Sequence, residues 1–219
     1  MKTKFKLAVE FALFYIACPL VLWRLALSGA RVWVIPFLWV AAILAAVWLA
    51  RKRGWTREKF FGLRGVKRND WLWLGLRALV GAAVLTVVLG LLAKPARLFV
   101  FPREHTRFWT AVMLAYPVAS VFPQGIVYRA LFFERYAPLF GRFAFVASVA
   151  AFSFCHIVFN NPHALVLTFF GGLLFSWQYR RTGSLMFAGM EHALMGDLAF
   201  TIGWGMYLHG GMLAARGGG

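Results

Sequence analysis

Long runs of apolar residues alternate along this chain with short clusters of polar and charged residues. A helix that crosses about 30 Å of hydrocarbon needs about 20 mostly apolar residues. Eight segments meet this requirement, the last two being short and rich in glycine. They lie at residues 7–27, 32–50, 71–93, from about 108 onward, and at 143–159, 164–179, 184–200 and 201–215. The pattern predicts an all-α, polytopic membrane protein with about eight transmembrane helices.

The composition agrees with this pattern. Hydrophobic residues make up 62% and charged residues 14% of the 219 residues, and the mean hydropathy is +0.71. Soluble domains are nearer half apolar and a quarter charged, so a water-soluble enzyme is disfavoured. Two cysteines exclude a disulfide scaffold. The chain shows no internal repeat, and we expect one integral membrane domain over residues 1–219.

A third of the basic residues behind the formal net charge of +17 lie in one loop. Eight of the 24 Lys and Arg residues lie in the stretch 51–70, between two apolar runs, which favours anionic lipid headgroups as partner rather than nucleic acid. With eight spans and the N-terminus inside, the inner segments hold 16 of the basic residues and the outer segments five. This asymmetry predicts that both termini are cytoplasmic. The apolar run after the basic start is too long for a signal peptide, so we expect a retained first helix.

Polar side chains in the second half fall at similar predicted depths. If the fourth span reaches the inner boundary near Tyr136, the helical rise places Gln124 about 18 Å above that boundary. The same reasoning gives about 21 Å for His156, about 12 Å for His192 and about 20 Å for Asp197. Ionisable groups in hydrocarbon are costly and usually face the bundle interior. We therefore expect side chains of three helices to meet in one cavity near mid-bilayer.

Several hydrolytic chemistries do not fit these residues. An aspartyl protease needs two apposed carboxylates, but the second aspartate, Asp70, lies in the basic loop. No HExxH string is present, which excludes the common helical zinc protease. A serine nucleophile would have to pair with a histidine, and Ser184 is too close to the inner edge to reach His156. What remains is His156, His192, one carboxylate, and Arg129.

At three segments the sequence resembles the CPBP family of CAAX proteases and bacteriocin-processing enzymes, also called ABI. The family's first motif, EExxxR, aligns with Gln124–Arg129, where the arginine is kept and the glutamates are replaced by Gln124 and Gly125. The second motif, FxxxH, is intact at residues 152–156. The third is a histidine followed four residues later by Asn or Asp. His192 matches it, position 196 is Gly, and Asp197 comes one residue late.

The resemblance covers residues 116–208 and implies a motif-bearing core at about 108–215. In the family, a glutamate of the first motif activates water, and the two histidines with the Asn or Asp bind a metal or the oxyanion. The resemblance thus implies a site of Gln124, Arg129, His156, His192 and Asp197. It further implies a divalent metal such as zinc on His156, His192 and Asp197, and a bacterial inner-membrane location. If Asp197 instead acts as the base, the metal needs water or another donor such as Asn160 beside the two histidines.

Three functions stay open from the sequence. The first is an intramembrane endopeptidase that cleaves a membrane-associated peptide or protein. The second is an inactive pseudoprotease that binds such a partner, because neutral Gln124 cannot take a proton from water. The third is haem ligation by His156 and His192. Among acidic residues, we expect Glu191 to face away from the site and Glu134 to pair with Arg135 or Arg129. Without the resemblance, the two histidines would be read as interhelical hydrogen-bonding groups.

Overall fold

The computed structural model describes residues 2–29, 33–52, 54–92 and 97–205. Within these ranges every regular element is helical, which confirms the predicted fold class. The first element is a continuous rod built from α1 (Lys2–Ala12), the π-helical turn η1 (Leu13–Ala17) and α2 (Cys18–Leu27). It is followed by α3 (Val34–Arg51), the short α4 (Arg57–Phe61) and the long α5 (Arg68–Leu92).

The second half begins with α6 (Val100–Glu104) and α7 (Thr106–Tyr116). Next comes a long segment of η3 (Pro117–Val121), α8 (Phe122–Gly125) and the π-helical η4 (Ile126–Tyr136). After α9 (Ala137–Phe140) and η5 (Gly141–Phe143), the chain forms α10 (Ala144–Phe154) and the 3-10 turn η6 (Cys155–Phe159). The last elements are α11 (Pro162–Thr182) and α12 (Leu185–Ile202).

Four of the described helical stretches are long and apolar enough to cross a membrane. They are Lys4–Leu27, Val34–Arg51, Arg68–Leu92 and Thr106–Phe159. The first three match the first three predicted spans, and the fourth contains the predicted fourth and fifth. The chain turns within that stretch at Gly141, whose φ of 52° favours glycine. The predicted spans at 164–179 and 184–200 are helices α11 and α12, and the predicted eighth span falls mostly on residues 206–215, outside the described residues.

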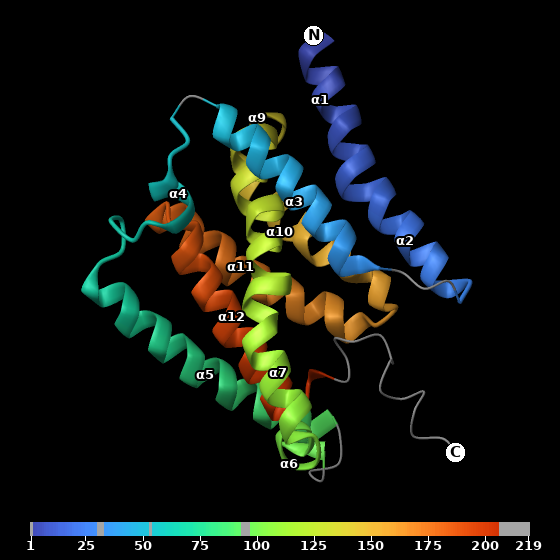
Figure 1. The fold of residues 1–219 in the computed structure, drawn as a ribbon, viewed down its shortest axis with the longest axis vertical. Coiled ribbons are helices and arrows are strands. Elements are labelled where there is room, and N and C mark those ends of the chain that lie inside the picture. The colour runs from blue at the N-terminus through green and yellow to red at the C-terminus, as the bar shows by residue number, and fades with distance from the viewer. Residues whose placement is uncertain (1, 30–32, 53, 93–96, 206–219) are drawn as a thin grey trace.

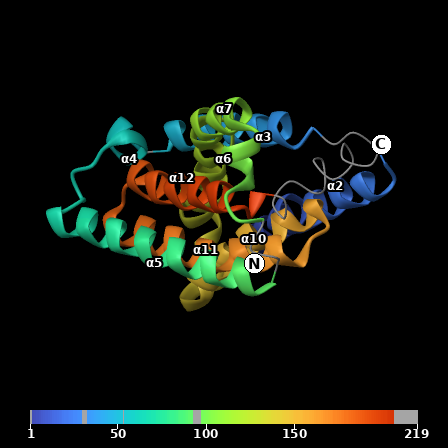
Figure 2. The same cartoon turned by 90° about the horizontal axis from the view of Figure 1, so that it is seen from below.

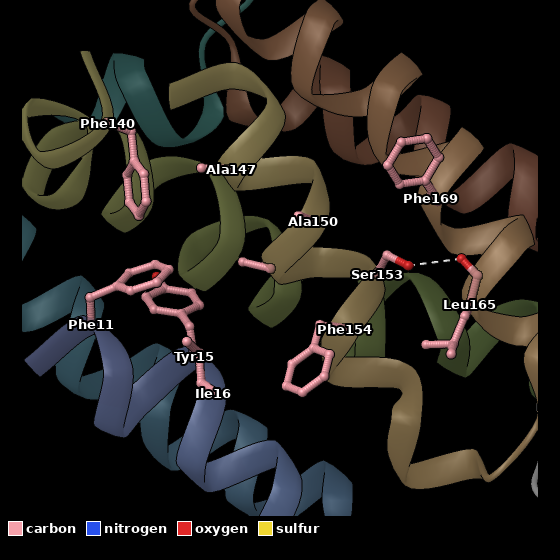
Figure 3. Close-up of a pocket in the computed structure, with 11 residues that line it drawn as sticks. Phe11, Tyr15, Ile16, Phe140, Ala147, Ala150, Ser153, Phe154, Leu165 and Phe169 are labelled. Atoms are coloured by element: carbon pink, nitrogen blue, oxygen red, sulfur yellow. Dashed lines mark hydrogen bonds between the residues drawn. The ribbon is translucent and has the colours of Figure 1, made fainter. Parts of the chain in front are cut away.

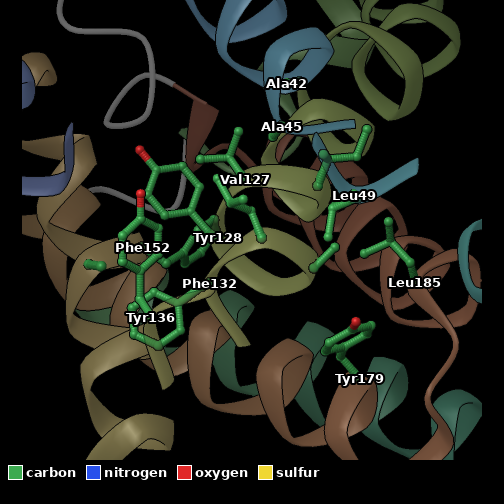
Figure 4. Close-up of a cluster of buried hydrophobic side chains, with 14 of the residues drawn as sticks. Ala42, Ala45, Leu49, Val127, Tyr128, Phe132, Tyr136, Phe152, Tyr179 and Leu185 are labelled. Atoms are coloured by element: carbon green, nitrogen blue, oxygen red, sulfur yellow. The ribbon is translucent and has the colours of Figure 1, made fainter. Parts of the chain in front are cut away.

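The segment α8–η4 forms the centre of the molecule. Every residue from Ile126 to Phe132 is buried, and the surrounding hydrophobic core draws residues from α3, α10, α11 and α12. Figure 1 shows this yellow-green segment running through the middle of the bundle, with α3 on one side and α12 on the other. Figure 4 shows the side chains of Tyr128, Phe132 and Tyr136 on this segment, with Leu49 of α3 and Leu185 of α12 among the other core residues.

The flanking helices expose apolar faces outward. In α5, Leu79 is 72% and Leu91 is 81% exposed, although both are apolar. Such residues suit the hydrocarbon of a bilayer, in which apolar side chains need no protein cover. Figure 2 shows α5 along the outside of the bundle beside α12, with which it makes extensive contact. The integral membrane assignment rests on these faces together with the four apolar stretches.

Candidate functional site

A fully buried arginine lies at the centre of the bundle. Arg129 of η4 is 1% exposed, and its three guanidinium nitrogens have no hydrogen-bond partner among the described residues. The guanidinium lies 4.8 Å from the ring centroid of Phe152 and 5.2 Å from that of Phe175. Aromatic faces attract a cation, but they do not satisfy its N–H groups. The site therefore holds a positive group whose hydrogen-bonding capacity is unused.

Both predicted histidines lie beside the ring of Phe152. The His156 ring centroid is 5.0 Å from that of Phe152, and the His192 centroid is 5.4 Å from Phe152. The imidazole of His192 also stacks on Phe175 at 4.4 Å. Phe152 and Phe175 thus gather Arg129, His156 and His192 from η4, η6 and α12 into one buried cluster. The sequence predicted one cavity for Gln124, His156, His192 and Asp197; the contacts with Phe152 bring the two histidines together, and their level in the bilayer stays a prediction.

The hydrogen bonds of the histidines are unequal. Nδ1 of His156 lies 2.8 Å from the carbonyl oxygen of Phe152, one turn earlier. Because a carbonyl only accepts, Nδ1 carries the proton and Nε2 keeps a lone pair. Nε2 of His192 lies 3.2 Å from the hydroxyl of Tyr116, and its buried Nδ1 has no partner within the described ranges. Sequence reasoning missed Tyr116 and Phe175, since neither belongs to a motif.

Gln124 is buried on α8, close in sequence to Arg129. Its Nε2 donates to Ser120 Oγ at 2.7 Å, while its Oε1 has no partner among the residues described. A Cβ on Gly125 would lie 3.9 Å from Arg129 Nη1 and 3.2 Å from Leu185 Cδ1. A glutamate at position 125 would therefore start beside the guanidinium. The change to glycine explains why Arg129 lacks a neighbouring carboxylate at this position.

The acidic residues of α12 lie on different sides of that helix. Glu191 is 1% exposed and pairs with Arg77 of α5, which also donates to Gln178 at 3.2 Å. This pairing agrees with the expectation that Glu191 faces away from the histidines. Asp197 is half-buried, and its Oδ1 has no partner in the described part of the chain. Helical rotation places Asp197 about 140° from His192, whereas Gly196 is about 40° from it.

Three other polar residues have structural roles. Glu134 pairs with Lys52 at 2.6 Å, so the expectation that it would pair with Arg135 or Arg129 is wrong. Arg135 instead binds Glu10, because η4 and the first helix lie side by side at that level. Ser184 caps α12 by accepting from the Phe187 amide at 3.0 Å and is not placed as a nucleophile.

Donors for a metal are few. No group of three or more His, Cys, Asp or Glu side chains that could hold a metal ion is found among the described residues. Oδ1 of Asn160 accepts from Trp23 Nε1 at 3.2 Å, so this residue is already engaged. A catalytic zinc usually has three protein ligands. The described donor set does not fit such a site.

A separate apolar groove of about 520 Å³ lies between the first helix and α10 and α11. Figure 3 shows Phe11 and Tyr15 on one side of it and Phe154 on the other, with Leu165 and Phe169 farther along. The Phe140 ring packs against Phe11, with centroids 4.9 Å apart. Its polar member Ser153 donates to the Leu165 carbonyl at 2.8 Å, so its hydroxyl is satisfied. The groove contains none of the predicted site residues.

Comparison with known proteins relates the second half to one family. The family described as type II CAAX prenyl endopeptidase Rce1-like matches residues 106–196, which include Tyr116, all of the first two motifs and His192. This match confirms the resemblance to the CPBP family that the motifs predicted. Comparisons with curated proteins and with solved structures give no match.

Proposed function

Residues 106–196 are related to the CAAX prenyl endopeptidases, and from this premise we propose that the chain is an intramembrane endopeptidase. Its substrate would be a membrane-associated peptide or protein, bound at the cluster of Arg129, His156 and His192. The observation that carries the proposal is the burial of Arg129 without an anionic or hydrogen-bonding partner among described residues. A buried cation is costly unless an anion is matched to it. Peptide hydrolysis creates such an anion on the carbonyl oxygen.

In the proposed reaction His156 is the general base. Its Nε2 lone pair removes a proton from water while the water oxygen attacks the peptide carbonyl carbon. The N–H groups of Arg129 stabilise the negative oxygen that forms. The protonated His156 then gives its proton to the leaving amine nitrogen, which breaks the C–N bond and restores the neutral imidazole. In this scheme Gln124 orients the water, and His192 contributes its unpartnered Nδ1 to the site.

The second candidate is a pseudoprotease that binds a membrane peptide without cleaving it. The observation in its favour is the neutral pair Gln124 and Gly125 at the position of the glutamates. Loss of a general base typically costs about 10²–10⁴-fold in rate. Binding would survive that loss, because Arg129 and the histidines remain buried around the two phenylalanine rings.

Turnover of quenched fluorescent peptides by the purified chain in liposomes separates the two candidates. We expect slow cleavage that His156→Ala and His192→Ala each abolish. His163→Ala is the matched control, because His163 is exposed at the start of α11 and should keep the wild-type rate. Peptide binding with no turnover by the wild-type chain would favour the pseudoprotease. Cleavage that survives both histidine substitutions would contradict the proposed site.

Restoring the carboxylate is a second test. Gln124→Glu keeps the side-chain shape and adds an acid, and Gly125→Glu adds the second one next to Arg129. The second change requires the Leu185 side chain to move, since a Cβ at 125 would lie 3.2 Å from it. If Gln124 is what limits the rate, we expect Gln124→Glu to raise turnover by up to about 10²–10⁴-fold. No gain in turnover would mean that water activation already depends on His156.

The cofactor and the location remain proposals as well. Elemental analysis of the purified chain tests the predicted divalent metal on His156, His192 and Asp197. An absorbance spectrum tests for haem, which would need to displace the Phe152 ring that both imidazoles contact. We propose a bacterial inner-membrane location with cytoplasmic termini, and anionic lipid headgroups bound by the basic stretch 51–70. Labelling of a cysteine placed at either terminus reports the orientation.

A further inference from the structure

Tyr116 occupies the space that the third family motif reserves for a side chain of α12. A Cβ on Gly196 would lie 2.5 Å from the Tyr116 hydroxyl oxygen and 2.7 Å from its Cζ. Real Cβ atoms do not approach other heavy atoms so closely, so any residue larger than glycine at 196 requires Tyr116 to move. Gly196 lies one helical turn after His192 and on the same side of α12. The glycine and the tyrosine therefore form a matched pair at the predicted site.

The Tyr116 hydroxyl also contacts the histidine that this motif contains. Its oxygen lies 3.2 Å from His192 Nε2, and the two rings meet nearly at right angles, with centroids 6.1 Å apart. Tyr116 is held in this position by Phe200, whose ring lies edge-on at 5.1 Å. The tyrosine comes from the end of α7, immediately before Pro117, and so from an element outside the three motifs.

The burial of His192 indicates how its proton is shared. Nδ1 is buried without a partner among the described residues, so a proton there would be an unsatisfied buried donor. An unpaired buried N–H is less often tolerated than an unpaired acceptor. With the proton on Nε2, this nitrogen donates to the Tyr116 oxygen, and the donor left unpaired among the described residues is the Tyr116 hydroxyl. A hydroxyl proton can rotate towards a water or a ligand, whereas a ring N–H is fixed, and this favours the Nε2–H tautomer. The hydroxyl proton of Tyr116 then stays available for a third group.

We propose that Tyr116 replaces the Asn or Asp of the third motif as the positioning residue of His192. It fixes the imidazole as the Nε2–H tautomer and directs the bare Nδ1 into the site. The same hydroxyl is left free to donate to the substrate carbonyl oxygen. Only this last role rests on the proposed peptidase function, because the tautomer and the steric exchange exist without turnover.

The tautomer is tested by nitrogen NMR of the chain labelled with ¹⁵N-histidine, with His192 assigned by its loss in His192→Gln. We expect a protonated Nε2 and an unprotonated Nδ1 in the wild type. Tyr116→Phe keeps the ring and removes the acceptor, so both nitrogen signals of His192 should move towards a mixture of tautomers. Tyr179→Phe, in which a buried tyrosine of α11 loses its hydroxyl, is the control and should leave His192 unchanged. Unchanged His192 signals in Tyr116→Phe would overturn the proposal.

An exchange of side chains tests the steric part. Gly196→Asn should lower the thermal midpoint of the wild type sharply, and it should be tolerated when combined with Tyr116→Ala. Gly189→Asn is the control on the same helix, because nothing lies within 4 Å of a Cβ at that position; it should behave alike in both backgrounds. If the chain cleaves peptides, Tyr116→Ala should lower the rate. Adding Gly196→Asn to this variant should then raise the rate about tenfold above that of Tyr116→Ala alone. Equal destabilisation by Gly196→Asn with Tyr116 and with Tyr116→Ala would overturn the proposed steric relation between the two positions. If Tyr116→Ala does relieve the destabilisation but no variant cleaves peptides, only the proposed peptidase activity is contradicted.

Discussion

The two halves of the chain are similarly apolar, yet they differ in what they bury. Within the most apolar 18 residues of each stretch, 6% are buried in α5 and 11% in the first helix. The buried share rises to 39% in Thr106–Phe159. Leu91 and Leu79 of α5 face outward, while Arg129, His156 and His192 of the second half lie inside. Hydrocarbon accepts leucine as readily as a protein core does. Polar residues, more than apolar ones, therefore mark the interior of this protein.

The interior charges also differ between the helices. Arg77 of α5 is matched to Glu191 of α12, and so it joins the outer helix to the core. Arg129 of η4 has aromatic rings beside it and no described hydrogen-bond partner. The first arginine therefore stabilises the packing of α5, and the second is held in an energetically unfavourable state that suits an anionic ligand.

The largest expected contrast follows from these two arginines. Arg77→Met leaves the Glu191 carboxylate buried and unpaired, which should lower the free energy of unfolding by about 3–5 kcal/mol. Arg129→Met removes a buried charge that pairs with no anion in the described part of the chain, so the free energy of unfolding should be unchanged or rise by about 1–4 kcal/mol. Denaturant titration in mixed micelles measures both.

The matched control is Arg77→Met combined with Glu191→Gln, which removes both charges and should recover much of the loss. Arg129→Met should also abolish peptide cleavage or peptide binding, whichever the chain performs. A strong destabilisation by Arg129→Met would mean that this arginine has a structural partner and would weaken the proposed site.

A second contrast compares a phenylalanine of the buried segment η4 with a phenylalanine of the outer helix α3. Phe132 of η4 is fully buried and Phe37 of α3 is 58% exposed. Phe132→Ala should lower the free energy of unfolding by about 3–5 kcal/mol, because a large cavity is left in the core. Phe37→Ala should change it by no more than about 0.5 kcal/mol. Equal losses for the two variants would place α3 inside a larger assembly rather than against lipid.

The smallest contrast concerns two helical glycines. A Cβ on Gly172 of α11 would lie 3.0 Å from Phe152 Cδ1 and 3.4 Å from Val149 Cγ1, while a Cβ on Gly90 of α5 would meet nothing within 4 Å. Gly90→Ala should raise the free energy of unfolding by about 0.5–1 kcal/mol through helix propensity. Gly172→Ala should lower it by about 1 kcal/mol, because it crowds the ring between the two histidines.

Thermal unfolding of the two glycine variants reports these changes. Gly172→Ala should also impair activity or binding, since Phe152 contacts Arg129, His156 and His192. A stabilised and fully functional Gly172→Ala variant would show that the aromatic rings are not positioned as tightly as the packing implies.

The sequence determined the membrane class, the helical fold and the motif residues, because apolar length and the cost of buried polar groups act locally along the chain. It predicted that His156 and His192 meet in one cavity, and both contact Phe152, while their shared level in the bilayer stays a prediction. Glu134 was assigned to the wrong partner, since Lys52 is brought to it only by the packing of α3 on η4. The count of eight spans stays a prediction, because four described stretches, which do not include α11 or α12, meet the length and composition needed to cross a membrane.

Only the tertiary structure decided which groups complete the site. Tyr116 reaches His192 from 76 positions away, and no spacing rule connects them. That no described residue hydrogen-bonds the Arg129 guanidinium is likewise a property of the whole bundle, because any helix could have supplied a partner. Motifs record residues on one helix at fixed intervals, whereas hydrogen bonds and steric fit between helices depend on how those helices pack. For this reason the sequence identified the candidate site residues, and the packing of α7, η4 and α12 determined which side chains those residues contact.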